Sequence, residues 1–188
     1  MPKEIVPLMS EHAHIDPSNK KVALLIAILA LCLAISETLS KAYQTEVITK
    51  QVEASNLWAF FQAKSIRKTS TELAMESMQA ITQPNDAQAQ ELIKKWSAAV
   101  KRYDTEPETG EGRKELAARA KKAQQLGEIA NHKYHNLEVS SGMLQVSIVL
   151  SSASIIANVM LLAWFAGGLG AIAIGFGLFA MFGGSILF

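Results

Sequence analysis

Two histidines and a carboxylate in this 188-residue chain have the spacing of a metal site or of a pH-sensitive surface. Glu128, His132 and His135 follow one another at intervals of four and three residues, so a helix would place all three on one face. Two imidazoles and a carboxylate can bind Zn²⁺, and histidine changes charge between about pH 5 and 8. A polar helix face at a membrane surface has the same composition. We expect no metal and no other cofactor, and we keep a metal- or pH-responsive membrane sensor as an alternative function.

A second polar pattern lies in the uncharged C-terminal part of the chain. Ser147, Ser151, Ser154 and Asn158 would lie along one face of a helix. Such a face could line a path for water or ions, or it could form hydrogen bonds with a neighbouring helix. Proteins that move ions usually need an ionisable residue within the membrane, and this segment has none. The pattern favours a helix contact, with a small channel or transport component as the alternative.

The sequence contains no pattern typical of an enzyme or of a nucleic-acid-binding protein. A glycine-rich phosphate loop, a nucleophile elbow and a zinc-protease HExxH motif are all missing from it. The net charge is only +1, from 18 basic and 17 acidic residues, so there is no strong field to attract nucleic acid. We expect a protein that is not an enzyme and does not bind nucleic acid.

Three apolar segments have the length of membrane spans. Glu138 is the last charged residue, so everything beyond it is uncharged. We predict transmembrane helices at residues 20–40, 143–165 and 168–188, each close to the roughly 20 residues that a bilayer requires. The last two would be joined by a turn at Gly167 and Gly168. Residues 1–19 are predicted to be a loose polar tail.

The charged residues 41–140 are predicted to form a helical arm outside the membrane. Its helices would span about 41–81, 86–102 and 112–140, because breaks are expected around Pro84 and in the acidic segment 103–112. The first of these helices carries a stripe of apolar residues at helical spacing: Ile48, Val52, Ala59, Ile66 and Leu73. Three polar residues interrupt that stripe: Ser55, Gln62 and Thr69.

A heptad seam continues from the third arm helix into the following apolar segment. Its members recur at alternating intervals of four and three residues: Leu116, Ala120, Ala123, Gly127, Ala130, Tyr134, Leu137, Ser141, Leu144 and Ile148. Many of them are small, which lets two helix backbones approach closely. The last span repeats small residues four apart at Gly167, Ala171 and Gly175. We predict that Leu116 through Leu137 of the seam, with these three residues, form oligomer contacts.

Two tracts of the chain resemble a family of bacterial membrane proteins catalogued as domain of unknown function 4337. The first tract is LWAFFQAKSIR at residues 57–67, soon after the first apolar segment. The second is HKYH at 132–135 together with LQVSIVLSS at 144–152. The likeness extends over nearly the whole chain from Lys20. It implies a three-span inner-membrane protein with a coiled-coil insert and no assigned activity.

Together these patterns predict an all-α membrane protein with three transmembrane helices and a long antiparallel, coiled-coil-like arm. Its expected function is that of a non-enzymatic oligomeric scaffold or accessory subunit. The expected partners are membrane lipid, further copies of the chain and an unknown membrane protein. The expected location is the bacterial inner membrane. Lys20 and Lys21 at the start of the first span favour a cytoplasmic N-terminus, which puts the arm in the periplasm.

Overall fold

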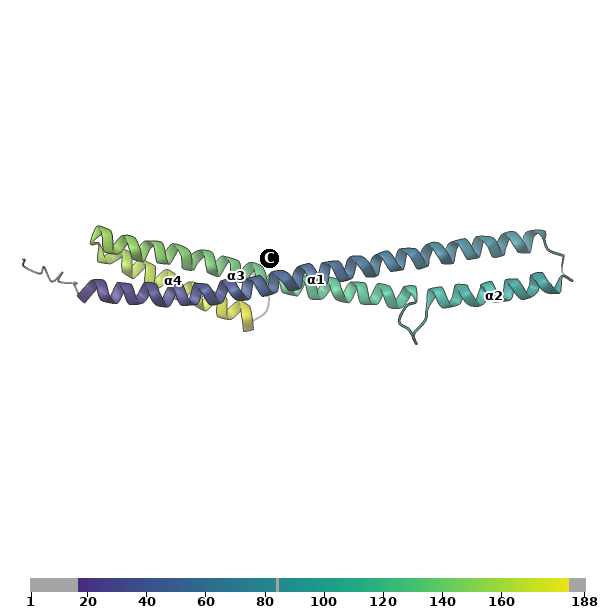
Figure 1. Ribbon diagram of the computed structural model, residues 1–188, viewed down its shortest axis with the longest axis horizontal. Coiled ribbons are helices and arrows are strands. Elements are labelled where there is room, and N and C mark those ends of the chain that lie inside the picture. The colour runs from purple at the N-terminus through teal and green to yellow at the C-terminus, as the bar shows by residue number, and fades with distance from the viewer. Residues whose placement is uncertain (1–16, 84, 183–188) are drawn as a thin grey trace, which may run out of the picture. The chain divides into compact units, whose positions relative to one another are not determined.

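The computed structural model describes residues 17–83 and 85–182, and within these ranges it contains four helices and no strand (Figure 1). The helices are α1 (Pro17–Ile81), α2 (Ala87–Asp104), α3 (Arg113–Ala157) and α4 (Met160–Phe182). The predicted all-α class is therefore confirmed for the described residues. Most of the predicted N-terminal tail and residues 183–188 of the predicted third span lie outside them, and residues 17–19 already belong to α1.

The described chain divides into two units. The apolar unit contains α1 up to Leu39, α3 from Asn136 onward, and α4. The arm unit contains residues 40–135, including α2. Three of the helices, α1, α3 and α4, are long and apolar enough to cross a membrane. At 1.5 Å per residue, α4 is about 35 Å long, against a hydrocarbon core of about 30 Å.

The turn before the last helix is formed by Asn158 and Val159, so the prediction of a turn at Gly167 and Gly168 was wrong. Asn158 has a φ of 54°, a left-handed conformation that asparagine adopts more readily than most residues. Both glycines lie inside α4, which begins at Met160 rather than at residue 168. Glycine often marks turns, but within an apolar helix its missing side chain also allows close packing.

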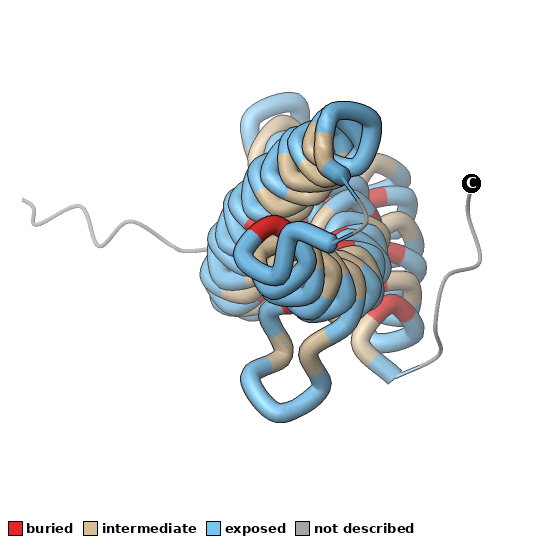
Figure 2. Tube along the Cα trace, turned by 90° about the vertical axis from the view of Figure 1, so that its right-hand side faces the viewer, coloured by how far each residue is buried: buried red, intermediate tan, exposed pale blue. Residues whose placement is uncertain are grey.

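The apolar unit is held together by small residues of α4. Its buried face consists of Ala163, Ala166, Gly170, Ala173, Gly177 and Ala180. A Cβ atom at Gly170 would overlap the side chain of Leu29, and one at Gly177 would lie 2.9 Å from the Ser140 hydroxyl. Leu29 and Leu144 complete this core. Buried positions recur as short red bands along the helices in Figure 2.

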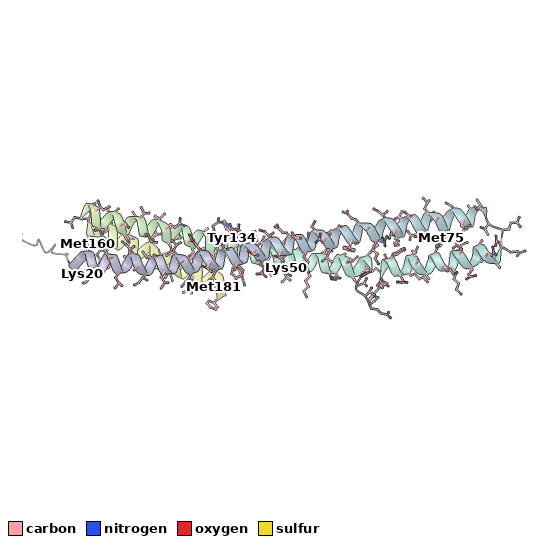
Figure 3. All side chains as sticks on the ribbon, viewed as in Figure 1. Lys20, Lys50, Met75, Tyr134, Met160 and Met181 are labelled. Atoms are coloured by element: carbon pink, nitrogen blue, oxygen red, sulfur yellow. The ribbon has the colours of Figure 1, made fainter. Side chains whose placement is uncertain are left out.

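The arm unit has a separate core between α1 and α3. Its buried members are Ala54, Leu57, Leu116, Ala120 and Ala123. Further along the arm, α1 packs against α2 instead of α3 (Figure 1). Figure 3 marks the arm part of α1 by Lys50 and Met75. The side chain of Asp86 caps α2 by accepting hydrogen bonds from the Gln88 and Ala89 amides at 3.0 and 3.1 Å.

Candidate functional site

A cluster of buried serines joins the three helices of the apolar unit. The Ser36 hydroxyl donates to the Leu137 carbonyl oxygen at 3.3 Å, and the Ser141 hydroxyl donates to the Ser36 oxygen at 2.9 Å. The Ser140 hydroxyl donates to the Ala173 carbonyl oxygen at 2.7 Å. These bonds connect α1, α3 and α4 where hydrophobic packing alone would give little direction. Ser36 and Ser140 were not among the residues predicted to be functional, although both are polar residues in apolar stretches.

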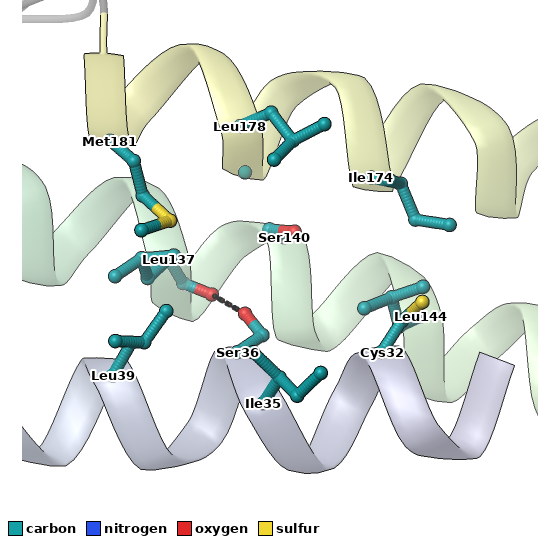
Figure 4. Close-up of a pocket in the computed structure, with 11 residues that line it drawn as sticks. Cys32, Ile35, Ser36, Leu39, Leu137, Ser140, Leu144, Ile174, Leu178 and Met181 are labelled. Atoms are coloured by element: carbon teal, nitrogen blue, oxygen red, sulfur yellow. Dashed lines mark hydrogen bonds between the residues drawn. The ribbon is translucent and has the colours of Figure 1, made fainter. Parts of the chain in front are cut away.

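A pocket of about 170 Å³ lies beside this cluster (Figure 4). Most of the side chains around it are apolar: Cys32, Ile35, Leu39, Leu137, Leu144, Ile174, Leu178 and Met181. Its two polar members, Ser36 and Ser140, already donate hydrogen bonds to backbone carbonyls of the chain. The pocket therefore presents a largely apolar surface, and none of its lining residues is charged.

Only three of the four residues of the predicted polar line of α3 lie in the same environment. Ser147, Ser151 and Ser154 are buried, the first two completely. The Ser147 hydroxyl donates to the Met143 carbonyl oxygen of its own helix at 2.8 Å, and the buried Ser151 hydroxyl has no hydrogen-bond partner among the described residues. Asn158 is exposed at the turn instead. The three serines thus face the packed interior of the single chain.

The three candidate metal ligands lie in α3, but they do not form a metal-binding group. Within residues 17–83 and 85–182, no three His, Cys, Asp or Glu side chains gather closely enough to hold an ion. Glu128 is exposed and lines a groove of about 350 Å³ between α1 and α3 of the arm. His132 is half-buried and His135 is exposed.

Side chains of the tract at residues 57–67 bind α1 to the start of α3. Trp58 and Phe61 stack edge to face, with ring centroids 5.4 Å apart. The guanidinium of Arg113 lies 5.1 Å from the Phe61 ring centre, and its Nε donates to the Ser65 hydroxyl at 2.9 Å. Lys64 lies over the ring of Tyr103 at 5.8 Å. The inward-facing residues of this tract therefore have a structural role.

Carboxylates around the loop between α2 and α3 strengthen the same joint. Asp104 forms ion pairs at 3.3 Å with Lys68, Arg113 and Lys114. Hydrogen bonds from Lys114 and then Lys68 hold the pKa of Asp104 below its ordinary value.

Two glutamates, Glu106 and Glu115, also accept hydrogen bonds around the α2–α3 loop. Glu115 accepts from the Thr105 hydroxyl at 2.7 Å and from the Glu106 amide at 3.2 Å, and the Thr105 bond is the main cause of its lowered pKa. The pKa of Glu106 is lowered chiefly by its hydrogen bond from Arg102. Ionised carboxylates that serve as acceptors in this way hold elements together and need no catalytic role.

The seam predicted on α3 finds a partner inside the chain. Its buried members are Leu116, Ala120, Ala123, Gly127, Ala130, Leu137, Ser141 and Leu144, and Tyr134 and Ile148 are half-buried. A Cβ at Gly127 would lie 3.3 Å from the Cβ of Lys50 on α1, so the small residue does permit a close helix approach. The close helix that the seam predicted is α1 of the same chain, and these residues are not free to contact another copy.

Two other predicted stripes lie on the surface of the single chain. The five apolar stripe residues of α1 are all exposed: Ile48, Val52, Ala59, Ile66 and Leu73. In α4, Ala171 and Gly175 are exposed, Gly167 is half-buried, and a Cβ at Gly175 would meet nothing within 4 Å. The face of α4 that packs within the chain is therefore a different one from the predicted seam.

Comparison with known proteins gives one match. The model of a family described as "Domain of unknown function (DUF4337)" matches residues 18–183. No curated protein and no solved structure matches the chain.

Proposed function

The chain belongs to the DUF4337 family, whose description names no activity, and we propose that it is a non-enzymatic membrane protein acting as an oligomeric scaffold or accessory subunit. One observation carries this proposal. Serines, carboxylates and aromatic residues of the described chain join its own helices to one another. The apolar stripe on α1 of the arm, in contrast, remains exposed. Such a surface suits protein contact better than chemistry.

We place the apolar parts of α1 and α3, together with α4, in the bacterial inner membrane as spans. Their length and apolar composition support this placement. Lys20 and Lys21 lie at the start of the first span and favour a cytoplasmic N-terminus. The arm unit would then be periplasmic.

The arm unit is proposed to be an antiparallel, coiled-coil-like hairpin. Its contacts support that direction, because positions further along α1 meet positions further back in α3. The ammonium of Lys133 lies 5.3 Å from the ring centre of Tyr43, Gly127 is next to Lys50, and Arg113 binds Ser65. The heptad spacing of the α3 seam supports the coiled-coil character.

The oligomeric part of the proposal is tested by measuring the mass of the full-length chain in lipid nanodiscs, together with chemical cross-linking in native membranes. We expect one defined oligomer over a wide range of protein concentration. A monomer at every concentration would contradict the proposal. Recovery of the chain as a soluble monomer without detergent would contradict its membrane part as well.

The channel and sensor alternatives have less support. A water-filled path lined by Ser147 and Ser151 requires exposed hydroxyls, whereas both side chains are fully buried within one chain. Ion flux into vesicles containing the purified protein should not exceed that into empty vesicles. Flux that changes with Asn158→Leu would favour the channel, and Zn²⁺ bound at neutral pH in equilibrium dialysis would favour the sensor.

A further inference from the structure

The arm part of α1 carries two heptad seams on nearly opposite faces. The inner seam faces α2 and α3, and all its members are buried or half-buried: Val47, Lys50, Ala54, Leu57, Phe61, Lys64, Lys68, Thr71 and Met75. The outer seam has the same alternating spacing, and all its members are exposed: Ile48, Val52, Ser55, Ala59, Gln62, Ile66, Thr69 and Leu73. The two faces separate cleanly because each seam keeps its own seven-residue period.

The outer seam is long and largely apolar, yet the chain does not cover it. It extends over about 26 residues, or roughly 39 Å of helix. Ile48, Val52, Ile66 and Leu73 are exposed by 56, 54, 66 and 63%. A sustained heptad pattern on a solvent-facing surface is the signature of a second helix that packs there.

We propose that the outer seam binds the same seam of a second copy of this chain, with the two α1 helices parallel and in register. This inference rests on the proposed oligomeric function and specifies its interface. In heptad terms, Val52, Ala59, Ile66 and Leu73 occupy the a positions, and Ile48, Ser55, Gln62 and Thr69 the d positions.

The distribution of charge supports an identical partner. The charged residues of α1 between positions 46 and 68 all lie off the outer seam and its flanks: Glu46, Lys50, Glu53, Lys64, Arg67 and Lys68. The flanking e and g positions from 49 to 70 are uncharged: Thr49, Gln51, Asn56, Trp58, Ala63, Ser65 and Ser70. Two copies can therefore meet without repulsion between like charges. Charged e and g residues are what usually select a different chain, and of the e and g residues beside this seam only Glu72, next to Leu73, is charged.

The polar members of the seam suit pairing with themselves. Ser55, Gln62 and Thr69 each carry groups that can both donate and accept a hydrogen bond. When two parallel helices are in register, each of these residues faces its own counterpart and both sides can be satisfied. Polar residues at such core positions fix the register of coiled coils at some cost in stability.

The membrane proposal supplies the direction of pairing. α1 is a single helix from Pro17 to Ile81 and includes the first span. Copies inserted with the same topology therefore have α1 helices that point the same way. Parallel pairing is the geometry that in-register contacts require.

The decisive experiment is disulfide cross-linking of single-cysteine variants of the full-length chain in native membranes. The native Cys32 is first removed by Cys32→Ala. Ala59→Cys then tests the seam, and Ala74→Cys is the matched control, since both alanines are exposed on α1 but Ala74 belongs to neither seam. We expect mild oxidation to convert Ala59→Cys to a disulfide-linked homodimer at least about tenfold faster than Ala74→Cys, because a-position side chains face each other.

A charge substitution tests the same surface without a new cysteine. Ile66→Lys would place two ammonium groups opposite each other, and we expect association to weaken by more than about tenfold. Ile129→Lys is the control, because Ile129 is 54% exposed on α3 and lies outside the seam. An unchanged helical circular dichroism spectrum would show that both variants fold, as expected for exposed positions.

The outcomes separate this inference from the proposed function. An oligomer that persists in Ile66→Lys and gives no Ala59→Cys cross-link overturns the interface but leaves the oligomeric scaffold standing. A wild-type monomer at all concentrations removes both. If Ala59→Cys cross-links only to a different protein or to lipid-linked reagents, the outer seam does not bind a second copy of this chain, and the inference is overturned.

Discussion

Asp104 connects three segments of the arm by one carboxylate. It is the last residue of α2, and it forms ion pairs with Lys68 of α1 and with Arg113 and Lys114 at the start of α3. Exposed ion pairs contribute little one at a time, but several that share one acceptor act on the same joint. The position of the α2–α3 loop should therefore depend on this residue being ionised.

Lowering the pH should weaken the arm through Asp104, Glu106 and Glu115. Their pKa values in the folded chain lie below the ordinary ones, which are about 3.9 for Asp and 4.3 for Glu in an unfolded chain. Stability from these groups is complete above those ordinary values and is lost as the pH falls through the lowered ones. We expect the melting temperature of the arm, followed by circular dichroism, to be flat from pH 7 to about 5 and to fall below about pH 4.

Asp104→Asn is the control for this pH dependence. The amide cannot ionise, so the variant should melt earlier than the wild type at pH 7 and should lose less on acidification. Identical acid profiles for the two proteins would show that Asp104 does not contribute.

Sequence alone could place acidic residues in the loop but could not give them partners. Asp104 and Lys68 are 36 residues apart, and their pairing follows only from the way α1 packs against α2. The same is true of Ser36 and Ser141, which are 105 residues apart. Local patterns predict which groups are polar, whereas docking of helices decides which polar groups meet.

Among the elements, the aromatic tract of α1 offers a direct test of which face packs. Leu57 is buried in the arm core, while Phe60 is 63% exposed. Leu57→Ala should lower the free energy of unfolding of the arm by about 2–5 kcal/mol. Phe60→Ala removes a larger side chain but should change it by no more than about 0.5 kcal/mol. Chemical denaturation of both variants makes the comparison, and equal losses would contradict the assigned faces.

The turn between α3 and α4 should depend on the backbone of Asn158. Its φ of 54° disfavours β-branched residues and suits glycine. We expect Asn158→Val to destabilise the apolar unit by about 1–2 kcal/mol and Asn158→Gly to be nearly neutral. Thermal unfolding in detergent measures both. If valine were tolerated as well as glycine, the turn would not require this conformation.

Helix bounds followed from the sequence where strong breakers are present, and failed where glycine had another use. α1 ends at Ile81, α2 ends at Asp104 and α3 begins at Arg113, close to the predicted breaks. Gly167 and Gly168 looked like a turn but lie inside a helix, and the turn used Asn158 instead. The two seams of α1 show a second limit. Apolar periodicity indicated the outer one, whereas the face that the chain covers is the inner one, which also contains several polar and charged residues.

At the scale of the whole molecule, the proposed membrane topology can be tested with an impermeant thiol reagent. In a Cys32→Ala background, Glu108→Cys places a thiol in the exposed α2–α3 loop. If the arm is periplasmic, this thiol should be labelled before lysis in bacterial cells with a permeabilised outer membrane. Lys3→Cys, near the N-terminus, should be labelled only after the inner membrane is opened. The reverse pattern would invert the topology.

The separation of charge along the chain was enough to predict three helices capable of spanning a membrane. It could not show which helix would cover the α3 seam, because that choice depends on competition between α1 of the same chain and another copy. The chain's own α1 is tethered through α2 and the loops, so its effective concentration near α3 is high.

Substitutions on the two faces of α1 should also have different effects. Changes at Ile48, Val52, Ala59, Ile66 or Leu73 touch no core residue of the arm, so related chains can acquire or lose self-recognition there without redesigning the hairpin. One organism could thus keep two such proteins in the same membrane and prevent them from mixing by altering a few surface side chains.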